Sequence, residues 1–332
     1  VGLEYGKGDV KPRPASQVYD NKYGDCKDKS ILLVTMLREA GIEAYPVGVS
    51  TLFNGQAWKE IPRIDALNHI ITLCIINDER IWLDPTVETV SFGDIHGGIL
   101  DRNALVILDD GYEFIRIPIE PPEKNMEQEI MTVHVAHDSS AKVFTTITTK
   151  GINAIYRRAF FKDLGPLYRK QNLEATVKGR TSDGMLLDYA VSDPEDLNHP
   201  HTVELVYTAP DYIHWEVNTG FIEASILSAN KAAITDDIRL YPVFLGNTSV
   251  GDLTVQINLP EEITIVSLPS AITLEIPQII FTTEYTREEN TIIFHLRYEK
   301  RGLYIPLENY SDYKELQEQV DKELKKKIIL QK

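Results

Sequence analysis

The sequence predicts an α+β protein in which a small mixed domain precedes an antiparallel β-sandwich. Three observations lead to this fold class. Residues 25–41 carry the apolar spacing of a buried helix, and short β-branched runs follow it. Three prolines between residues 118 and 122 interrupt the chain, because proline cannot continue a central strand. Beyond residue 128, many short strand-like runs alternate with polar turns, which is typical of a sandwich.

These patterns also predict the domain boundaries. We expect a first domain at residues 1–117, a linker at 118–128 and the β-sandwich at 129–332. Within the second domain, the pattern favours a helix at 152–163 that resumes to about residue 171, and a charged helix within 307–327. The strand-like runs there include 173–178, 221–227, 273–285 and a final strand at 328–330.

The composition excludes several classes of protein. A chain of 332 residues, 43% of them hydrophobic, is long enough to bury two cores. Its net charge of −16 argues against nucleic-acid binding, which needs a basic surface. No run approaches the ~18 apolar residues of a transmembrane helix. The two cysteines, Cys26 and Cys74, cannot make a disulfide framework, and we expect Cys74 to be a small core residue.

The N-terminus carries no secretory signal, since residues 1–5 lack a basic start and an apolar run. The first residue is Val1 rather than Met, and the helix that carries Cys26 begins within the first 30 residues. We therefore expect the chain to be the C-terminal portion of a longer protein, with any export signal on the missing part.

The first candidate functional residue lies at the start of the helix at 25–41. Asp25 is a favourable N-cap, and Asp28 three residues later completes an acidic capping box. Gly41 supplies the C-terminal stop. Cys26 is then the first helical residue, close to unpaired N–H groups and to the positive end of the helix dipole. This environment favours the thiolate, which is the nucleophilic form of cysteine.

Two partners for Cys26 follow in a predicted hairpin. His69 opens an apolar run at 69–76, and a second run at 81–86 contains Asp84 before a proline. In an antiparallel hairpin the start of the first strand lies beside the end of the second, so His69 and Asp84 would be neighbours. A carboxylate on one ring nitrogen orients a histidine whose other nitrogen faces a thiol.

These three segments resemble a known family. Residues 23–29 (Tyr-Gly-Asp-Cys-Lys-Asp-Lys), 67–69 (Leu-Asn-His) and 82–86 (Trp-Leu-Asp-Pro-Thr) are similar to motifs of the transglutaminase-like cysteine superfamily. The closest branch is bacterial and carries a β-rich module of unassigned function after the core. The resemblance covers about the first 110 residues and implies a papain-like cysteine core.

The resemblance implies a role for each of the three residues. Cys26 would be the nucleophile, His69 the general base and then acid, and Asp84 the carboxylate that orients His69. It also implies an extracytoplasmic location, periplasmic or secreted, in a bacterium. The sequence predicts no cofactor and no metal, and the expected partner is a protein or peptide substrate.

The predicted reaction is amide or peptide hydrolysis through a thioester. The alternatives are transfer of a glutamine acyl group to an amine, as in a transglutaminase, and a peptide- or glycan-binding scaffold without catalysis. Transglutaminases usually have Trp directly after the nucleophile, whereas this chain has Lys27. We expect the backbone N–H of Cys26 to serve the oxyanion, with a second donor from Gln17 or Tyr23.

Further residues are candidates for substrate or metal binding. We expect Tyr23, Trp58 and Asn68 to border the substrate, although Trp58 in the loop at 51–66 could equally be a packed surface residue. His96, in a Gly-rich loop, is a rival base without a strand scaffold or a matching carboxylate. The histidines of the second domain are typical of a turn rather than a metal site. This applies to the three that cluster loosely in the sequence, His199, His201 and His214.

Overall fold

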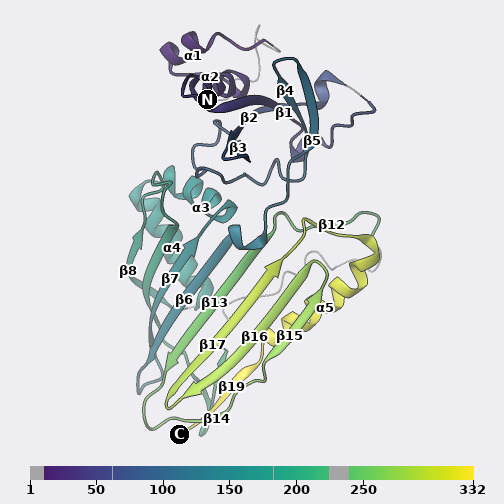
Figure 1. Cartoon of the computed structure of the whole chain (residues 1–332). Helices are drawn as coiled ribbons and strands as arrows, with labels where there is room; N and C mark the ends of the chain where they lie inside the picture. Colours follow the sequence, from purple (N-terminus) through teal and green to yellow (C-terminus); the bar gives the residue numbers. More distant parts are fainter. Residues whose placement is uncertain (1–10, 62, 182, 224–238) are drawn as a thin grey trace. The chain divides into compact units, whose positions relative to one another are not determined.

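The computed structural model describes residues 11–61, 63–181, 183–223 and 239–332. The chain forms two compact units, residues 1–120 and 121–332, which are described separately (Figure 1). The division between them falls inside the segment expected as a linker, and the first strand of the second unit begins at Met126. None of the described helices is long and apolar enough to cross a bilayer.

The helical layer of the first unit consists of α1 (Ala15–Asn21) and α2 (Cys26–Glu39). Helix α2 starts at the capping box predicted from the sequence and is followed by Gly41, whose φ of 78° suits a helix stop. It packs on the sheet through Ser30 and Val34. The expectation that all the apolar residues of this helix are buried is wrong, because Met36 is 55% exposed. Consecutive helical residues point about 100° apart, so these residues cannot all face one sheet.

The sheet of the first unit has five antiparallel strands in the order β3-β2-β1-β4-β5. The strands are β1 (Glu43–Val49), β2 (His69–Ile76), β3 (Glu79–Leu83), β4 (Asn103–Leu108) and β5 (Gly111–Arg116). The expected hairpin is β2–β3. Asn77 and Asp78 form its two-residue turn with φ of 53° and 64°, the left-handed values that such tight hairpins need.

The second unit is built on an eight-stranded sheet in the order β15-β16-β17-β13-β6-β7-β9-β8, with β8 and β15 at its edges (Figure 1). Only the β6–β13 pair within this sheet is parallel. The strands are β6 (Met126–Val135), β7 (Ala141–Thr149), β8 (Met185–Val191), β9 (His201–Ala209), β13 (Ser249–Asn258), β15 (Ile272–Ile276), β16 (Ile279–Glu288) and β17 (Thr291–Lys300).

A second layer covers one face of this sheet. A four-stranded sheet in the order β10-β11-β19-β14 and three helices contribute to the same hydrophobic core. These elements are β10 (His214–Glu216), β11 (Thr219–Glu223), β14 (Thr264–Ser267), β19 (Lys327–Gln331), α3 (Ile152–Lys162), α4 (Pro166–Arg180) and α5 (Tyr310–Leu324). A short pair, β12 (Val243–Phe244) with β18 (Tyr304–Ile305), completes the described strands. The α+β class is confirmed, with helices completing the layer that faces the large sheet.

Three segments of the second unit differ from the expected secondary structure or extend beyond the described residues. Residues 173–178 were expected as a strand but belong to α4, whose first residue, Pro166, fits the start of a helix. The single run at 273–285 is two strands, β15 and β16, because Pro277 and Gln278 turn the chain between them. Of the run at 221–227, residues 221–223 lie in β11 and the remainder lies outside the described residues.

A buried histidine makes the second unit sensitive to acid. His201 is 1% exposed and stacks on Phe161 at a centroid distance of 5.5 Å. Neither of its ring nitrogens has a hydrogen-bond partner among the described residues. Burial, followed by the nearby charges of Arg158, Arg157 and Arg169, lowers the pKa of His201 to about 4. The ring is therefore neutral in the folded protein at neutral pH.

We predict that His201→Phe removes an acid-sensitive contribution to stability. In the unfolded chain the histidine protonates near pH 6.5, so the free energy of unfolding should fall by about 2 kcal/mol as the pH drops from roughly 7.5 to 5. The loss continues toward the folded pKa of about 4. Urea unfolding at each pH, monitored by hydrogen exchange of the backbone amides of β9, measures this change in the free energy of unfolding. The control His214→Phe, at an exposed position, should keep the full acid sensitivity.

Candidate active site

Cys26 is the first residue of α2 and is partly buried. The side chain of Asp25 accepts a hydrogen bond from the N–H of Asp28 at 3.2 Å, and Asp28 accepts one from the N–H of Asp25 at 3.4 Å. Lys27 forms an ion pair with Asp25. The second thiol, Cys74, is fully buried in an apolar cluster, and both cysteines are free. Cys26 is thus the accessible thiol, at the positive end of a 14-residue helix.

A buried carboxylate fixes the start of this helix. Asp28 is 1% exposed and accepts hydrogen bonds from the backbone N–H of Arg13 at 2.8 Å and from its guanidinium at 2.9 Å. Gly24 passes so close that a Cβ there would lie 2.6 Å from the Cβ of Asp28 and 3.1 Å from Val18. The glycine before Asp25 is therefore explained by close packing against the helix.

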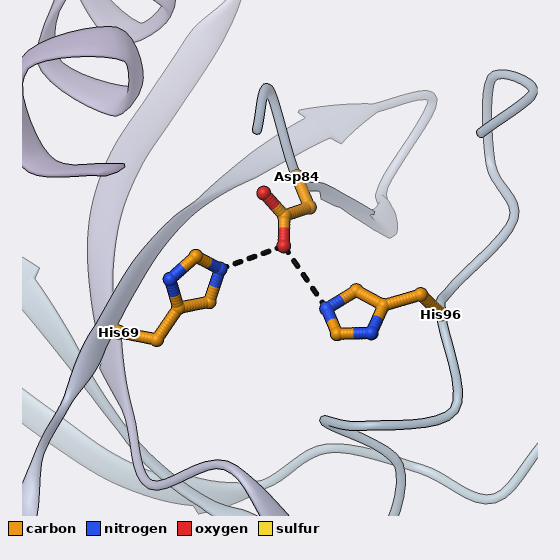
Figure 2. Close-up of side chains that lie close together, drawn as sticks. All are labelled: His69, Asp84 and His96. Carbon is orange, nitrogen blue, oxygen red and sulfur yellow. Dashed lines mark hydrogen bonds and ion pairs between the residues drawn. The ribbon is translucent and has the colours of Figure 1, made fainter. Parts of the chain in front are cut away.

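His69 and Asp84 lie together, as the hairpin predicts (Figure 2). The β2–β3 register pairs Thr72 with Leu83, which brings the residue after β3 beside the start of β2. Nε2 of His69 is 2.7 Å from Oδ2 of Asp84. The other carboxylate oxygen, Oδ1, accepts hydrogen bonds from the backbone N–H of Thr86 at 2.9 Å and from its hydroxyl at 2.6 Å. This local turn, just after the strand, orients the carboxylate.

The electrostatics of these residues favour a thiolate and an imidazolium. Burial raises the pKa of the Cys26 thiol, but interactions with His69 and the backbone of Ile70 outweigh it and bring the pKa below its ordinary value. Burial lowers the pKa of His69, but Asp84 and Cys26 outweigh it and raise the pKa to about 9. Burial opposes ionisation of Asp84, yet hydrogen bonds from His69, His96 and Thr86 hold its pKa well below the usual range.

His96 belongs to this cluster, and the expectation that it lacks a carboxylate partner is wrong. Its Nε2 lies 3.0 Å from Oδ2 of Asp84, the same oxygen that faces His69 (Figure 2). The rings of His69 and His96 are 6.3 Å apart and nearly perpendicular. No periodic pattern in the sequence indicates this contact, because His96 lies in an irregular loop. The available clue was that a buried carboxylate can accept more hydrogen bonds than one histidine supplies.

One group of side chains among the described residues has a spacing that could hold a metal ion. It consists of His69, Asp84 and His96, whose possible ligand atoms all lie within 4.8 Å of one another. The hydrogen bonds of His96 argue against a metal here. Nδ1 of His96 accepts a hydrogen bond from the N–H of Gly98 at 3.2 Å. A neutral imidazole that binds a metal through Nε2 carries its proton on Nδ1, where it would meet the Gly98 N–H. The tautomer that this hydrogen bond favours instead donates from Nε2 to Asp84.

The residues expected to border the substrate have different environments. Tyr23 is 40% exposed, and the guanidinium of Arg13 lies 5.3 Å from its ring centroid. Trp58 is 59% exposed on the loop before β2. Asn68 is occupied structurally, because its side chain accepts a hydrogen bond from the N–H of Thr51 at 2.8 Å and donates to the Thr51 hydroxyl at 2.9 Å. It closes the base of the 51–66 loop.

The remaining candidates have other surroundings. Gln17 lies on α1 and is exposed. In the second unit, Nδ1 of His199 lies 2.8 Å from Asp196, His201 is buried, and His214 is exposed on β10. The three histidines do not form a ligand group among the described residues.

Comparisons with known proteins address the family of this core. Residues 3–78 match the transglutaminase-like superfamily. The first unit is transglutaminase-like. The matched segment includes Cys26 and His69 and ends before Asp84 and His96. Residues 220–330 match a domain of unknown function with a solved structure (DUF3858). The resemblance found in the sequence motifs, including the β-rich companion module, is therefore confirmed.

A solved structure shares the fold over nearly the whole chain. It is the crystal structure of a protein from Parabacteroides distasonis ATCC 8503 named as a candidate protease, with a TM-score of 0.53 and 14% identity. The alignment covers 96% of this chain and 46% of that one, so the chain spans about half the length of that protein. No curated protein shows significant sequence similarity to the chain.

We predict that Gly24→Ala displaces the start of α2. The new Cβ would overlap the Cβ of Asp28, so the first unit should lose about 1–3 kcal/mol of stability. Because Cys26 lies at the displaced helix end, its alkylation by iodoacetamide should also slow. Thermal unfolding and alkylation rates measure the two effects. Gly111→Ala is the matched control, since a Cβ at Gly111 meets nothing within 4 Å; equal behaviour of the two variants would contradict the packing argument.

Proposed function

We propose that the first unit is a cysteine hydrolase that cleaves amide or peptide bonds. The observation that carries this proposal is the pairing of His69 with Asp84, whose Oδ2 lies 2.7 Å from Nε2 of His69. In addition, Cys26 raises the pKa of His69, and His69 lowers the pKa of the Cys26 thiol. This is the arrangement in which a histidine takes a proton from a thiol and a carboxylate stabilises the resulting imidazolium.

The proposed reaction has two steps. The Cys26 thiolate attacks the amide carbonyl carbon, and the new C–S bond gives a tetrahedral intermediate. His69 gives its proton to the departing nitrogen, so the C–N bond breaks and a thioester remains. His69, now neutral, takes a proton from water as the water oxygen attacks the thioester. The C–S bond then breaks, which releases the carboxylic acid and restores the thiolate beside protonated His69.

The start of α2 supplies an oxyanion donor in this proposal. The backbone N–H groups in the first turn of a helix have no acceptor within the helix. The N–H of Cys26 is one of these, and the helix dipole adds positive potential at the same place. We propose that this N–H stabilises the negative oxygen of the intermediate.

We propose water as the acceptor and a protein or peptide as the substrate. Lys27 follows the nucleophile where transglutaminases usually have Trp, and its ammonium group is held by Asp25. This position therefore lacks an aromatic wall that could shield the thioester from water. The family resemblance further leads us to propose that the protein acts outside the cytoplasm.

The first prediction from this mechanism concerns the ionisation of Cys26. In a Cys74→Ala background, the iodoacetamide rate should rise and reach a plateau well below the ordinary thiol pKa of about 8.5, because the lowered pKa populates the thiolate at lower pH. Replacement of His69 by Ala should move the rise to or above the ordinary value, since burial alone raises the pKa. The rate measured from roughly pH 5 to pH 10 tests this.

Two outcomes of that titration would count against the proposal. An unaltered profile in His69→Ala would mean that the thiol and imidazole are not coupled. A plateau in the absence of any peptide cleavage would favour a binding scaffold that retains the three residues. Cys26→Ser provides the control that alkylation occurs at this thiol.

A second prediction concerns the pH dependence and acceptor of turnover. Hydrolysis should fall above about pH 9, because His69 then lacks the proton that it gives to the leaving nitrogen. With a glutamine peptide and a primary amine, we expect ammonia release without incorporation of the amine. Mass spectrometry of the peptide distinguishes the products, and dominant amine incorporation would establish the transglutaminase reaction instead.

A further inference from the structure

The carboxylate of Asp84 accepts more hydrogen bonds than the proposed reaction requires. Oδ1 accepts two from Thr86, and Oδ2 is shared by His69 at 2.7 Å and His96 at 3.0 Å. The side chain of Asp84 is only 3% exposed, so water has little access to it. The mechanism assigns a role to His69 and leaves the second imidazole without one.

His96 is unsuited to be a second base. Its Nε2 faces Asp84, and its Nδ1 accepts the N–H of Gly98 at 3.2 Å. Both nitrogens are therefore engaged, and neither remains to take a proton from a thiol or a water. The Nδ1 contact also fixes which nitrogen carries the proton: Nε2–H must be the donor to Asp84.

We propose that His96 is a positioning residue that, together with Thr86, fixes the plane of the Asp84 carboxylate so that Oδ2 faces His69. This role rests on the proposed function, because it serves the pairing of His69 with Cys26. Thr86 holds only Oδ1, and the His69 ring that binds Oδ2 is itself the group that has to be oriented. His96 supplies a donor at Oδ2 that is independent of His69.

The chemistry of an imidazole suits this position. As a neutral donor, His96 anchors Oδ2 without supplying a positive charge, so the charge of Asp84 remains available to stabilise protonated His69. A lysine or arginine at the same place would compete for that charge. His96 thus differs in its effect from a structural ion pair.

Gly98 makes the tautomer of His96 possible. A Cβ at residue 98 would lie 2.9 Å from Cε1 and 3.1 Å from Nδ1 of His96. Any larger residue must push the ring or its backbone partner aside. The absence of a side chain at Gly98 therefore lets its N–H reach Nδ1, which in turn directs Nε2–H toward Asp84.

The decisive measurement is the protonation of His69 in protein labelled with 15N-histidine. Cys26→Ala is the parent, so the result does not depend on whether the thiol reacts. We expect His96→Leu to lower the midpoint of His69 by about one pH unit or more, because the less ordered carboxylate stabilises the imidazolium less. His96→Gln keeps an N–H donor and should titrate close to the parent. Gly98→Ala should shift the midpoint in the same direction as His96→Leu.

Each outcome decides the role of His96. A midpoint that is unchanged or raised in His96→Leu would overturn the proposal, as would a parent spectrum with the His96 proton on Nδ1. Tight binding of Zn²⁺ by the wild-type chain that is lost in His96→Gln would identify a metal site instead. If His69 shifts as expected and no peptide is cleaved, the positioning of Asp84 stands and the proposed hydrolysis fails. If peptide is cleaved and the midpoint of His69 does not shift, the proposed hydrolysis stands and the positioning role of His96 fails.

Discussion

The buried charge of Asp84 is the constraint on which the candidate site depends. An ionised carboxylate with so little access to water costs several kcal/mol unless the protein supplies donors. Here those donors come from three separate places in the first unit: His69 at the start of a strand, Thr86 in the turn after the hairpin, and His96 in a later loop. Loss of any one would leave part of the charge uncompensated. The chemistry of the site and the folding of these loops are therefore coupled.

The start of α2 presents the opposite electrostatic problem. Asp25 and Asp28 cap the helix, but a negative charge beside Cys26 opposes its thiolate, and Asp25 does raise the pKa of the thiol. Each carboxylate has a cationic partner: Arg13 holds Asp28, and Lys27 holds Asp25. Lys27, which replaces the tryptophan usual in transglutaminases, thus offsets the charge of the N-cap. The helix keeps its cap while the cost to the thiolate is reduced.

The sequence was informative where local chemistry determines structure. The capping box around Cys26 and the tight turn of the β2–β3 hairpin both follow from short-range rules, and they bring His69 and Asp84 together. Local rules failed where tertiary contacts decide. The run at 173–178 satisfies both helix and strand preferences, and only its packing as part of α4 resolves it. His96 was misjudged because an irregular loop has no periodicity from which its position could be inferred.

The hydrogen bonds of the candidate site lie within the first unit. Every hydrogen bond described for His69, Asp84 and His96 is made with a residue of the first unit. The second unit has an extensive core of its own, formed between its large sheet and the layer that covers it. Two separate cores are typical of domains that fold as independent units. The side chains proposed to carry the proton transfer, Cys26, His69 and Asp84, therefore all belong to the first unit.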